Sequence, residues 1–280
     1  EFFGDNLSAW TNTFAVFGVL SIVIFLITFV GTKERVKPSA KSKHEKLPFL
    51  KGIKVLFCNK YWLMITLTLV CIFIQYSLNG GAAVYYAKVV LHNAKLVGPM
   101  NLVASVVQII AMFFTAFIIK RIGKRNMLII GAIVYGLGFG MFQFVGTNYF
   151  GIMFASALKG IGNAGISSCM FAIVSDTIEY GEWKTGYRTE GLINSASSFG
   201  FKVGNGLGSA MLGWILALGN YAENAAVQSA SSVMAIKALF IYIPVAVAIL
   251  QIVIMLFYKL DKEYDGIVED LRNGKDAKEA

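Results

Sequence analysis

Long apolar runs separated by short polar segments dominate this chain. Seven runs approach or exceed 20 residues, and each is apolar nearly all round rather than along one face. A helix of about that length spans the roughly 30 Å hydrocarbon core of a bilayer. The runs are Trp10–Val30, Tyr61–Gly80, Val97–Ile119, Met127–Val145, Tyr149–Val174, Leu192–Leu218 and Val233–Tyr258. The pattern predicts an all-α integral membrane protein.

Composition supports a membrane protein and argues against an ordinary soluble domain. Hydrophobic residues make up 56% of the chain and charged residues only 15%, whereas about 25% charged is usual for a soluble domain. The formal net charge is +9, which in a soluble protein would favour nucleic-acid binding. Here the basic residues fall between apolar runs, so we expect the lipid bilayer, and no nucleic acid, as a partner.

Basic residues alternate from one connecting segment to the next. The segments Gly31–Lys60 and Lys120–Arg125 and the C-terminal tail are rich in Lys and Arg, whereas Gly146–Asn148 and Gly219–Ser232 have none. Basic segments stay in the cytoplasm. We therefore expect a multi-pass protein of the plasma membrane, in bacteria the inner membrane, with a cytoplasmic C-terminus.

The same pattern divides the chain into four parts. We expect residues 1–30 to form one span, 31–60 a flexible basic cytoplasmic linker, 61–258 a six-helix bundle and 259–280 a cytoplasmic tail with a short, fraying helix. A solvated linker is favoured over one whose lysines bind anionic lipid. Because the number of spans is odd and the chain starts at Glu1 rather than Met, we expect a fragment that lacks an N-terminal part.

The sixth run carries one ionisable residue well inside it, Lys202. It lies about ten residues, roughly 15 Å, from the nearer end of the run. A lysine at that depth costs several kcal/mol in hydrocarbon, so we expect it to face a water-filled cavity. On a helical wheel it shares one polar stripe with Ser195, Ser198, Asn205 and Ser209.

The other side of this helix is predicted to pack tightly. Gly200, Gly204 and Gly208 follow one another at GxxxGxxxG spacing, which allows close contact between membrane helices. The polar stripe has no acidic partner of its own, because no Asp or Glu lies within an apolar run. Either a polyhydroxylated or anionic solute, or a carboxylate in the missing part, is then expected to face Lys202.

The segment from Asp176 to Glu190 is rich in charges, aromatic residues and glycine, and we expect turns there. Under the topology above it lies at the cytoplasmic mouth of the cavity. A network of ion pairs at that place is suited to closing one side and breaking when that side opens. The expected gate residues are Asp176, Glu179, Glu182, Arg188 and Glu190, with Arg121 and Lys124 from the basic segment before the fourth run.

Two further runs carry polar groups. Gln75 and Asn79 are four residues apart and share a helix face; cavity lining and helix–helix hydrogen bonding are both open. With Lys202, Ser198 and Asn205 they are the candidate solute-binding residues. Lys159 in the fifth run either extends to the interface or lines a cavity. The widely spaced cysteines predict neither a disulfide framework nor a metal site, and we expect no cofactor.

Three segments carry a family resemblance. The segment from Asp176 to Gly191, DTIEYGEWKTGYRTEG, resembles a loop signature of the glycoside–pentoside–hexuronide:cation symporters, the melibiose-permease-like branch of the major facilitator superfamily. Lys202 matches the lysine of that family's eleventh helix. NGGAAVYYAKVVL, which starts at Asn79, resembles the end of the seventh helix, and IIKRIGKRN, which ends at Asn126, resembles the loop between the eighth and ninth.

The resemblance implies a twelve-helix transporter of two bundles that works by alternating access. This chain would supply helices six to twelve, with residues 1–30 as the last helix of the N-terminal bundle. A sugar would bind near the midplane, and the coupling cation, Na⁺ or H⁺, mainly in the missing bundle. Ser197 and Ser198 stand where melibiose-permease-like members have Gln-Thr, which argues against melibiose itself.

The favoured hypothesis is thus cation-coupled symport of a sugar or glycoside, and not an enzyme. A transporter of a lysolipid or another amphiphile is a close variant, which an apolar groove open to lipid would favour. A non-transporting membrane receptor is the alternative from another class. In a photoreceptor, the functional lysine would be expected in the seventh run, whereas Lys202 lies in the sixth.

Overall fold

The computed structural model describes residues 7–32, 49–187, 190–223, 225 and 227–273. The chain divides into two parts, Glu1–Lys46 and Leu47–Ala280. In the first part, α1 (Leu7–Gly31) is a single helix whose side chains from Thr11 onward are almost all exposed. Every regular element in the described residues is helical, which confirms the all-α class.

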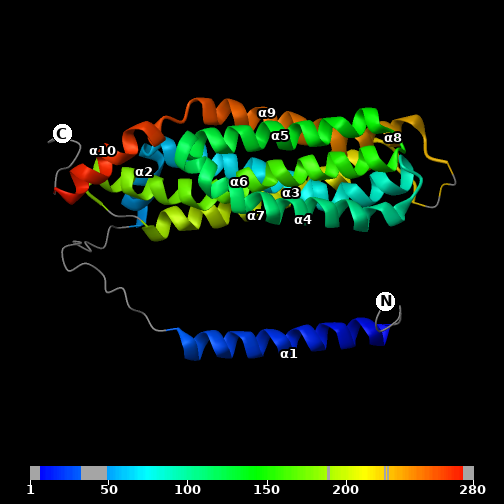
Figure 1. Cartoon of the computed structure of the whole chain (residues 1–280), viewed down its shortest axis with the longest axis horizontal. Coiled ribbons are helices and arrows are strands. Elements are labelled where there is room, and N and C mark those ends of the chain that lie inside the picture. The colour runs from blue at the N-terminus through cyan, green and yellow to red at the C-terminus, as the bar shows by residue number, and fades with distance from the viewer. Residues whose placement is uncertain (1–6, 33–48, 188–189, 224, 226, 274–280) are drawn as a thin grey trace. The chain divides into compact units, whose positions relative to one another are not determined.

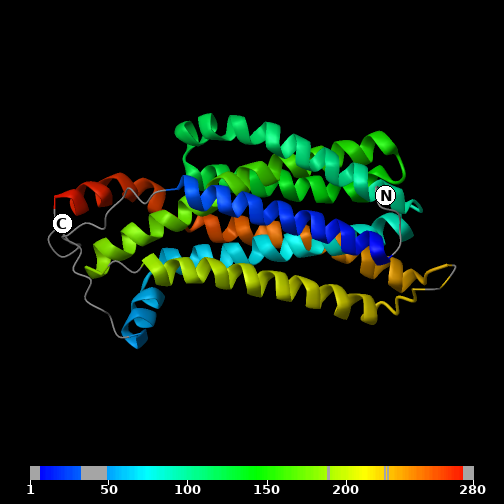
Figure 2. The same ribbon diagram turned by 90° about the horizontal axis from the view of Figure 1, so that it is seen from below.

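Six long rods make up most of the second part, and successive rods run in opposite directions (Figure 1). They are α3 (Lys60–Val89), α4 (Val97–Ile122), α5 (Lys124–Val145), α6 (Tyr149–Thr185), α7 (Glu190–Leu218), and a last rod built from α8 (Ala230–Lys237), the π-helical turn η2 (Ala238–Tyr242) and α9 (Ile243–Leu256). The short 3₁₀ turn η1 (Ala94–Leu96) precedes α4. Two short helices, α2 (Phe49–Cys58) and α10 (Leu260–Arg272), lie at one end of the bundle, which we call the α10 end (Figure 2).

Six helical segments of the described chain are long and apolar enough to cross a membrane: α1, α3, α4 with η1, α5, α6 and the α8–α9 rod. The seventh expected span, α7, has the length but is not among them; it carries Lys202, Asn205 and several glycines. The outer surface of α4 is apolar and uncovered, with Phe113 71% and Phe117 72% exposed. Such a surface suits lipid and not water.

The structure corrects three expectations about connecting segments. Residues from Asp176 to Thr185 do not form turns but continue α6, which ends at Gly186 with a φ of 72°. A glycine adopts this left-handed conformation readily, so the helix stops there and not ten residues earlier. The expected linker contains the helix α2 (Phe49–Cys58), and residues 33–48 of it lie outside the described part. In the tail, α10 is a docked helix with Leu260 and Ile267 buried, and not a fraying one.

Glycines bring α6 against both neighbours. A Cβ atom on Gly160 would lie 2.3 Å from the carbonyl oxygen of Ala104 in α4, and one on Gly162 would lie 2.3 Å from the backbone nitrogen of Tyr135 in α5. Neither site has room for a side chain. The three helices therefore approach at backbone distance near the middle of α6.

Gly200, Gly204 and Gly208 of α7 pack on α3 in the same way. A Cβ atom would lie 3.0 Å from Leu69 Cβ at Gly200, 2.7 Å from the Val70 carbonyl oxygen at Gly204 and 2.6 Å from Ser77 Cβ at Gly208. The GxxxGxxxG spacing thus coincides with a close interface to α3. Its effect is to leave the opposite side of α7, with Lys202, on the outside of this bundle.

We expect Gly162→Ala to destabilise the bundle. The new methyl group would meet backbone atoms of Tyr135 and Gly131, which cannot move independently, so α5 and α6 must separate. Overpacking of this kind costs about 1–3 kcal/mol. In detergent, the midpoint of thermal unfolding should fall by several degrees.

Gly206→Ala is the matched control, because nothing lies within 4 Å of a Cβ atom at that position in α7. It should leave the midpoint unchanged or raise it, since alanine favours a helix over glycine. Equal midpoints for both variants would show that α5 and α6 are not held at backbone distance.

Candidate functional site

A polar cavity of about 370 Å³ lies between α3, α4 and α6, near the middle of these helices, and opens to the surface beside Asn101 and Ser105, which are exposed. Its walls come mainly from α3, α4 and α6, with one residue from α5. The lining consists of Tyr76, Asn79, Asn101, Ala104, Ser105, Gln108, Tyr135, Lys159, Gly160, Asn163 and Ser167. Most of these side chains carry amides or hydroxyls, which is unusual for the interior of a membrane bundle.

Local helix geometry explains why these residues meet. Lys159, Asn163 and Ser167 follow one another at four-residue intervals, so they form one stripe on α6. On α4, Asn101 and Ser105 are also four apart, and Gln108 comes three residues later. Gly160 allows the α6 stripe to approach α4 at Ala104. The cavity is thus the place where polar stripes of neighbouring helices face each other.

A hydrogen-bond network fixes the polar groups. The Tyr76 hydroxyl donates to Asn163 Oδ1 at 2.6 Å and lies 3.1 Å from Ser167 Oγ. The Asn163 amide donates to Gln108 Oε1 at 3.0 Å. The network links α3, α6 and α4 side chain to side chain. It therefore holds amide and hydroxyl groups in set directions before any solute arrives.

Lys159 is the charged member of the site. It is only 5% exposed, and its ammonium group lies over the rings of Phe139, Phe142 and Phe240, at 4.3, 5.5 and 4.9 Å from their centroids. It also donates a hydrogen bond to Asn79 Oδ1. Aromatic faces and one amide oxygen thus surround a buried cation in place of a carboxylate. Of the two alternatives left open by the sequence, the structure favours cavity lining over extension to the interface.

Gln75 and Asn79 share a face of α3, but their side chains bond to different helices. Asn79 lines the cavity, and its oxygen is occupied by Lys159. Gln75 is fully buried: its amide donates to the Pro244 carbonyl oxygen at 2.7 Å and accepts from Gln251 at 2.8 Å. Both partners belong to α9, so in this structure Gln75 joins two helices and does not line the cavity. Positions four apart differ by about 40° around a helix, which is enough to place the two side chains in different interfaces.

The α7 stripe lies apart from the cavity lining. Lys202 and Ser198 are exposed on this bundle, and Asn205 is half-buried and donates to the Phe201 carbonyl oxygen at 3.0 Å. Within the described residues, no hydrogen bond or ion pair joins Lys202 to another side chain. The stripe is therefore an exposed polar line on a largely apolar helix surface.

A second polar cluster forms at the α10 end. Asp176 is 3% exposed and accepts from Lys124 Nζ with both carboxylate oxygens at 2.7 Å. Glu179 accepts a hydrogen bond from the Tyr264 hydroxyl of α10. Burial and the Glu179 carboxylate raise the pKa of Tyr264, so its phenol stays protonated and donates at neutral pH.

The other expected gate residues differ in their exposure. Glu182 is half-buried and Arg121 is exposed. Arg188 and the side chain of Glu190 lie outside the described residues. The structure adds Tyr264, Glu263 and Asp270 of α10 to this cluster: the Tyr61 hydroxyl donates to Glu263 at 3.2 Å and Trp183 Nε1 to Asp270 at 3.3 Å. The sequence had placed α10 outside the gate.

The sequence missed most of the cavity residues, although a signal for them exists. Asn101, Ser105 and Gln108 on α4, and Asn163 and Ser167 on α6, are polar residues at helical spacing inside apolar runs. Such spacing marks a wet or paired face in a membrane helix. Among the described residues, no group of three His, Cys, Asp or Glu side chains is placed to hold a metal ion.

Comparisons with known proteins agree with this membrane architecture. Residues 3–262 match the family model described as MFS/sugar transport protein. The chain is 32% identical to the isoprimeverose transporter of Lactiplantibacillus pentosus over 96% of this chain and 56% of that protein. It is 31% identical to a glucuronide carrier protein homolog of Escherichia coli, over 95% and 57%. It is 30% identical to a putative 2,3-dihydroxypropane-1-sulfonate exporter of the same organism, over 97% and 59%.

Two conclusions follow from these matches. The chain spans a little over half the length of the curated relatives it matches. The family match covers almost the whole chain, and it confirms the resemblance found in the central charged segment. These names describe membrane transporters and not enzymes. The chain belongs to the MFS/sugar transport protein family, in the melibiose-permease-like branch of the major facilitator superfamily.

Proposed function

We propose that this chain is the C-terminal part of a secondary transporter that carries a sugar or glycoside across the bacterial inner membrane by alternating access. The observation that carries the proposal is the polar cavity at middle depth in a membrane bundle. A water-accessible, hydrogen-bonding cavity in a bilayer serves a polar solute, because unpaired polar groups are costly in hydrocarbon.

The chemistry of the lining suits a polyhydroxylated solute. Amides of Asn79, Asn101 and Gln108 both donate and accept, as sugar hydroxyl groups do. Tyr76 and Tyr135 add aromatic surface for the apolar face of a sugar ring. A lysolipid would require a long apolar groove, so the polar lining favours a sugar over the amphiphile. The named substrates of the relatives, among them isoprimeverose and glucuronide, are also rich in hydroxyl groups.

The exposed stripe of α7 supports a second half for the site. Lys202, Ser198 and Asn205 share one face, and the described part of the second unit offers Lys202 no acidic partner. We assign residues 1–30 to the last helix of an N-terminal bundle and 61–258 to the C-terminal bundle. The carboxylate that faces Lys202, and the site of the coupling Na⁺ or H⁺, then belong to the N-terminal bundle.

The α10 end is assigned to the cytoplasm and to the gate. Lys124–Asp176 and Tyr264–Glu179 tie the C-terminal end of α6 to the start of α5 and to α10. Asp176 is nearly fully buried, so its pairing with Lys124 contributes more than an exposed pair would. Opening this side requires the α6 end to move relative to these partners. The basic residues of this end support its cytoplasmic position.

Lys202→Ala in the full-length transporter should abolish coupled accumulation. The variant removes the charge that completes the site with the N-terminal bundle. The measurement is uptake of a labelled sugar panel (isoprimeverose, a glucuronide and a pentose) into proteoliposomes under a Na⁺ or H⁺ gradient. Lys237→Ala, in α8 at the start of the last membrane-spanning rod, is the matched control and should transport normally. Accumulation equal to wild type in Lys202→Ala would remove Lys202 from the site.

Lys159→Met should weaken solute binding without unfolding the protein. Methionine keeps most of the side-chain length among the rings of Phe139, Phe142 and Phe240. It cannot donate a hydrogen bond to Asn79 Oδ1, so the Asn79 amide loses its fixed direction. We expect the apparent KM for the sugar to rise about tenfold, equivalent to about 1.4 kcal/mol. The midpoint of thermal unfolding should stay level or rise, because a buried charge is replaced by an apolar group.

Lys237→Met is the control for the loss of a lysine elsewhere in the bundle. A lower unfolding midpoint in Lys159→Met with unchanged KM would assign Lys159 to folding alone, and would contradict its place in the site.

A further inference from the structure

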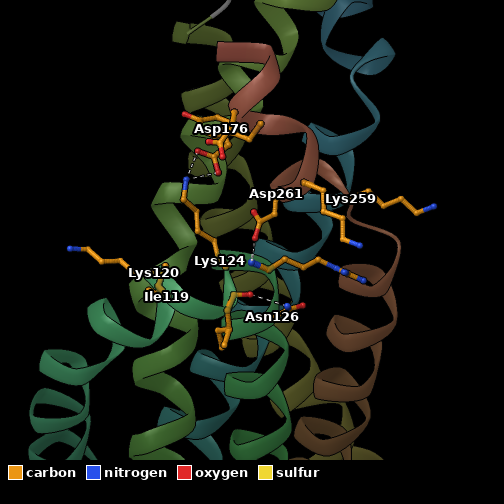
Figure 3. Close-up of a pocket in the computed structure, with 13 residues that line it drawn as sticks. Ile119, Lys120, Lys124, Asn126, Asp176, Lys259 and Asp261 are labelled. Atoms are coloured by element: carbon orange, nitrogen blue, oxygen red, sulfur yellow. Dashed lines mark hydrogen bonds and ion pairs between the residues drawn. The ribbon is translucent and has the colours of Figure 1, made fainter. Parts of the chain in front are cut away.

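A groove of about 460 Å³ lies at the α10 end, away from the polar cavity (Figure 3). It is formed by the end of α4, the α4–α5 turn, the start of α10 and Asp176 of α6. Lys120 lies on one side of it and Lys259 on the other, with Asp261 between them (Figure 3). The basic residues in its lining are Lys120, Lys124, Arg125, Lys259 and Lys262, and the acidic ones are Asp176, Asp261 and Asp265.

Two of the three acids are already engaged inside the protein. Asp176 binds Lys124 through both oxygens. Asp261 accepts from the backbone N–H of Arg125 at 2.7 Å, at the N-terminus of α5. Gly123 makes room for this contact, since a Cβ atom there would lie 2.9 Å from the Asp261 carboxylate. The helix start, with its partial positive charge, adds to the positive field of the groove.

Three lysines remain available. Lys120, Lys259 and Lys262 are exposed, and within the described residues no salt bridge joins them to an acid. Their long flexible side chains let the ammonium groups move toward a ligand. Asp265 and Asp261 stand against them, since a backbone N–H does not cancel the charge of Asp261, and the three lysines still outnumber these two acids. An anion is the ligand that fits it.

The surroundings of the groove are apolar on the side of the spans. Ile118 of α4 and Leu256 and Phe257 at the end of α9 are 42%, 53% and 66% exposed. Below the groove, α5 presents an uncovered stripe of Ile130, Ile133 and Leu137, spaced three and four residues apart. Since α5 contacts both α4 and α9, this stripe lies along the helix that starts at the groove.

We propose that the groove binds the phosphate of an anionic phospholipid, whose acyl chains lie along the exposed stripe of α5. The lysines provide the positive charge, and the start of α5 adds its dipole. The stripe provides an apolar surface that runs along α5 away from the groove, as the acyl chains of a bound lipid would. Basic pockets at the ends of membrane helices attract anionic lipid headgroups in this way. An inorganic phosphate shares the headgroup chemistry but gains nothing from the α5 stripe.

The test measures lipid binding to the full-length protein. Purified protein is titrated with phosphatidylglycerol, phosphatidylcholine or inorganic phosphate in detergent, and bound lipid is counted by native mass spectrometry. The variant is Lys120→Gln/Lys259→Gln/Lys262→Gln, which leaves the proposed gate and solute site untouched. The control is Lys88→Gln/Lys95→Gln/Lys237→Gln, three lysines at the opposite end of the bundle.

We expect phosphatidylglycerol to bind wild type and control equally, and the triple variant at least about tenfold more weakly. Raising NaCl from 0.1 to 0.5 M should weaken binding to wild type, because exposed charges are screened. Equal binding of phosphatidylcholine and phosphatidylglycerol would overturn the proposal, as would unchanged binding to the triple variant. Displacement of the lipid by millimolar phosphate would assign the groove to a free anion and reject the lipid.

Discussion

Close backbone contact between α6 and its two neighbours determines where the polar groups of this bundle meet. Gly160 and Gly162 lie two residues apart and turn to different partners, one to α4 and the other to α5. In lipid there is little hydrophobic force between helices, so such contact rests on packing and hydrogen bonds. Once α6 is fixed, its stripe of Lys159, Asn163 and Ser167 faces the cavity by geometry alone.

The buried charge of Lys159 is the main energetic problem that this arrangement solves. An ammonium group in hydrocarbon is costly in free energy, and it is normally paired with a nearby carboxylate. Here three phenylalanine rings and the Asn79 oxygen take that role. Aromatic rings and an amide oxygen differ from a carboxylate because they add no formal negative charge to the cavity.

The two polar regions of the bundle differ in the groups they employ. The cavity holds neutral amides and hydroxyls around one cation, which suits reversible binding of a polar solute. The α10 end holds carboxylates that pair with Lys124, with tyrosines and with a tryptophan, and these residues come from α3, α5, α6 and α10. These contacts fix the C-terminal end of α6 against α5 and α10. The division agrees with the proposal that solute binds at the centre of the bundle and that the α10 end forms the gate.

Periodicity alone determined the class of this protein, the approximate spans and the close-packing face of α7, because hydrophobicity over 20 residues and glycines four apart are local properties of a helix. The charged signature from Asp176 to Gly191 identified the family. The tertiary structure decided what each face meets. It placed Gln75 against α9 and Asn79 in the cavity, and continued α6 to Thr185. It also caged Lys159 while leaving Lys202 exposed. A helical wheel gives the direction of a side chain but not the neighbour in that direction, and the neighbours of these residues are up to 176 positions away in the chain.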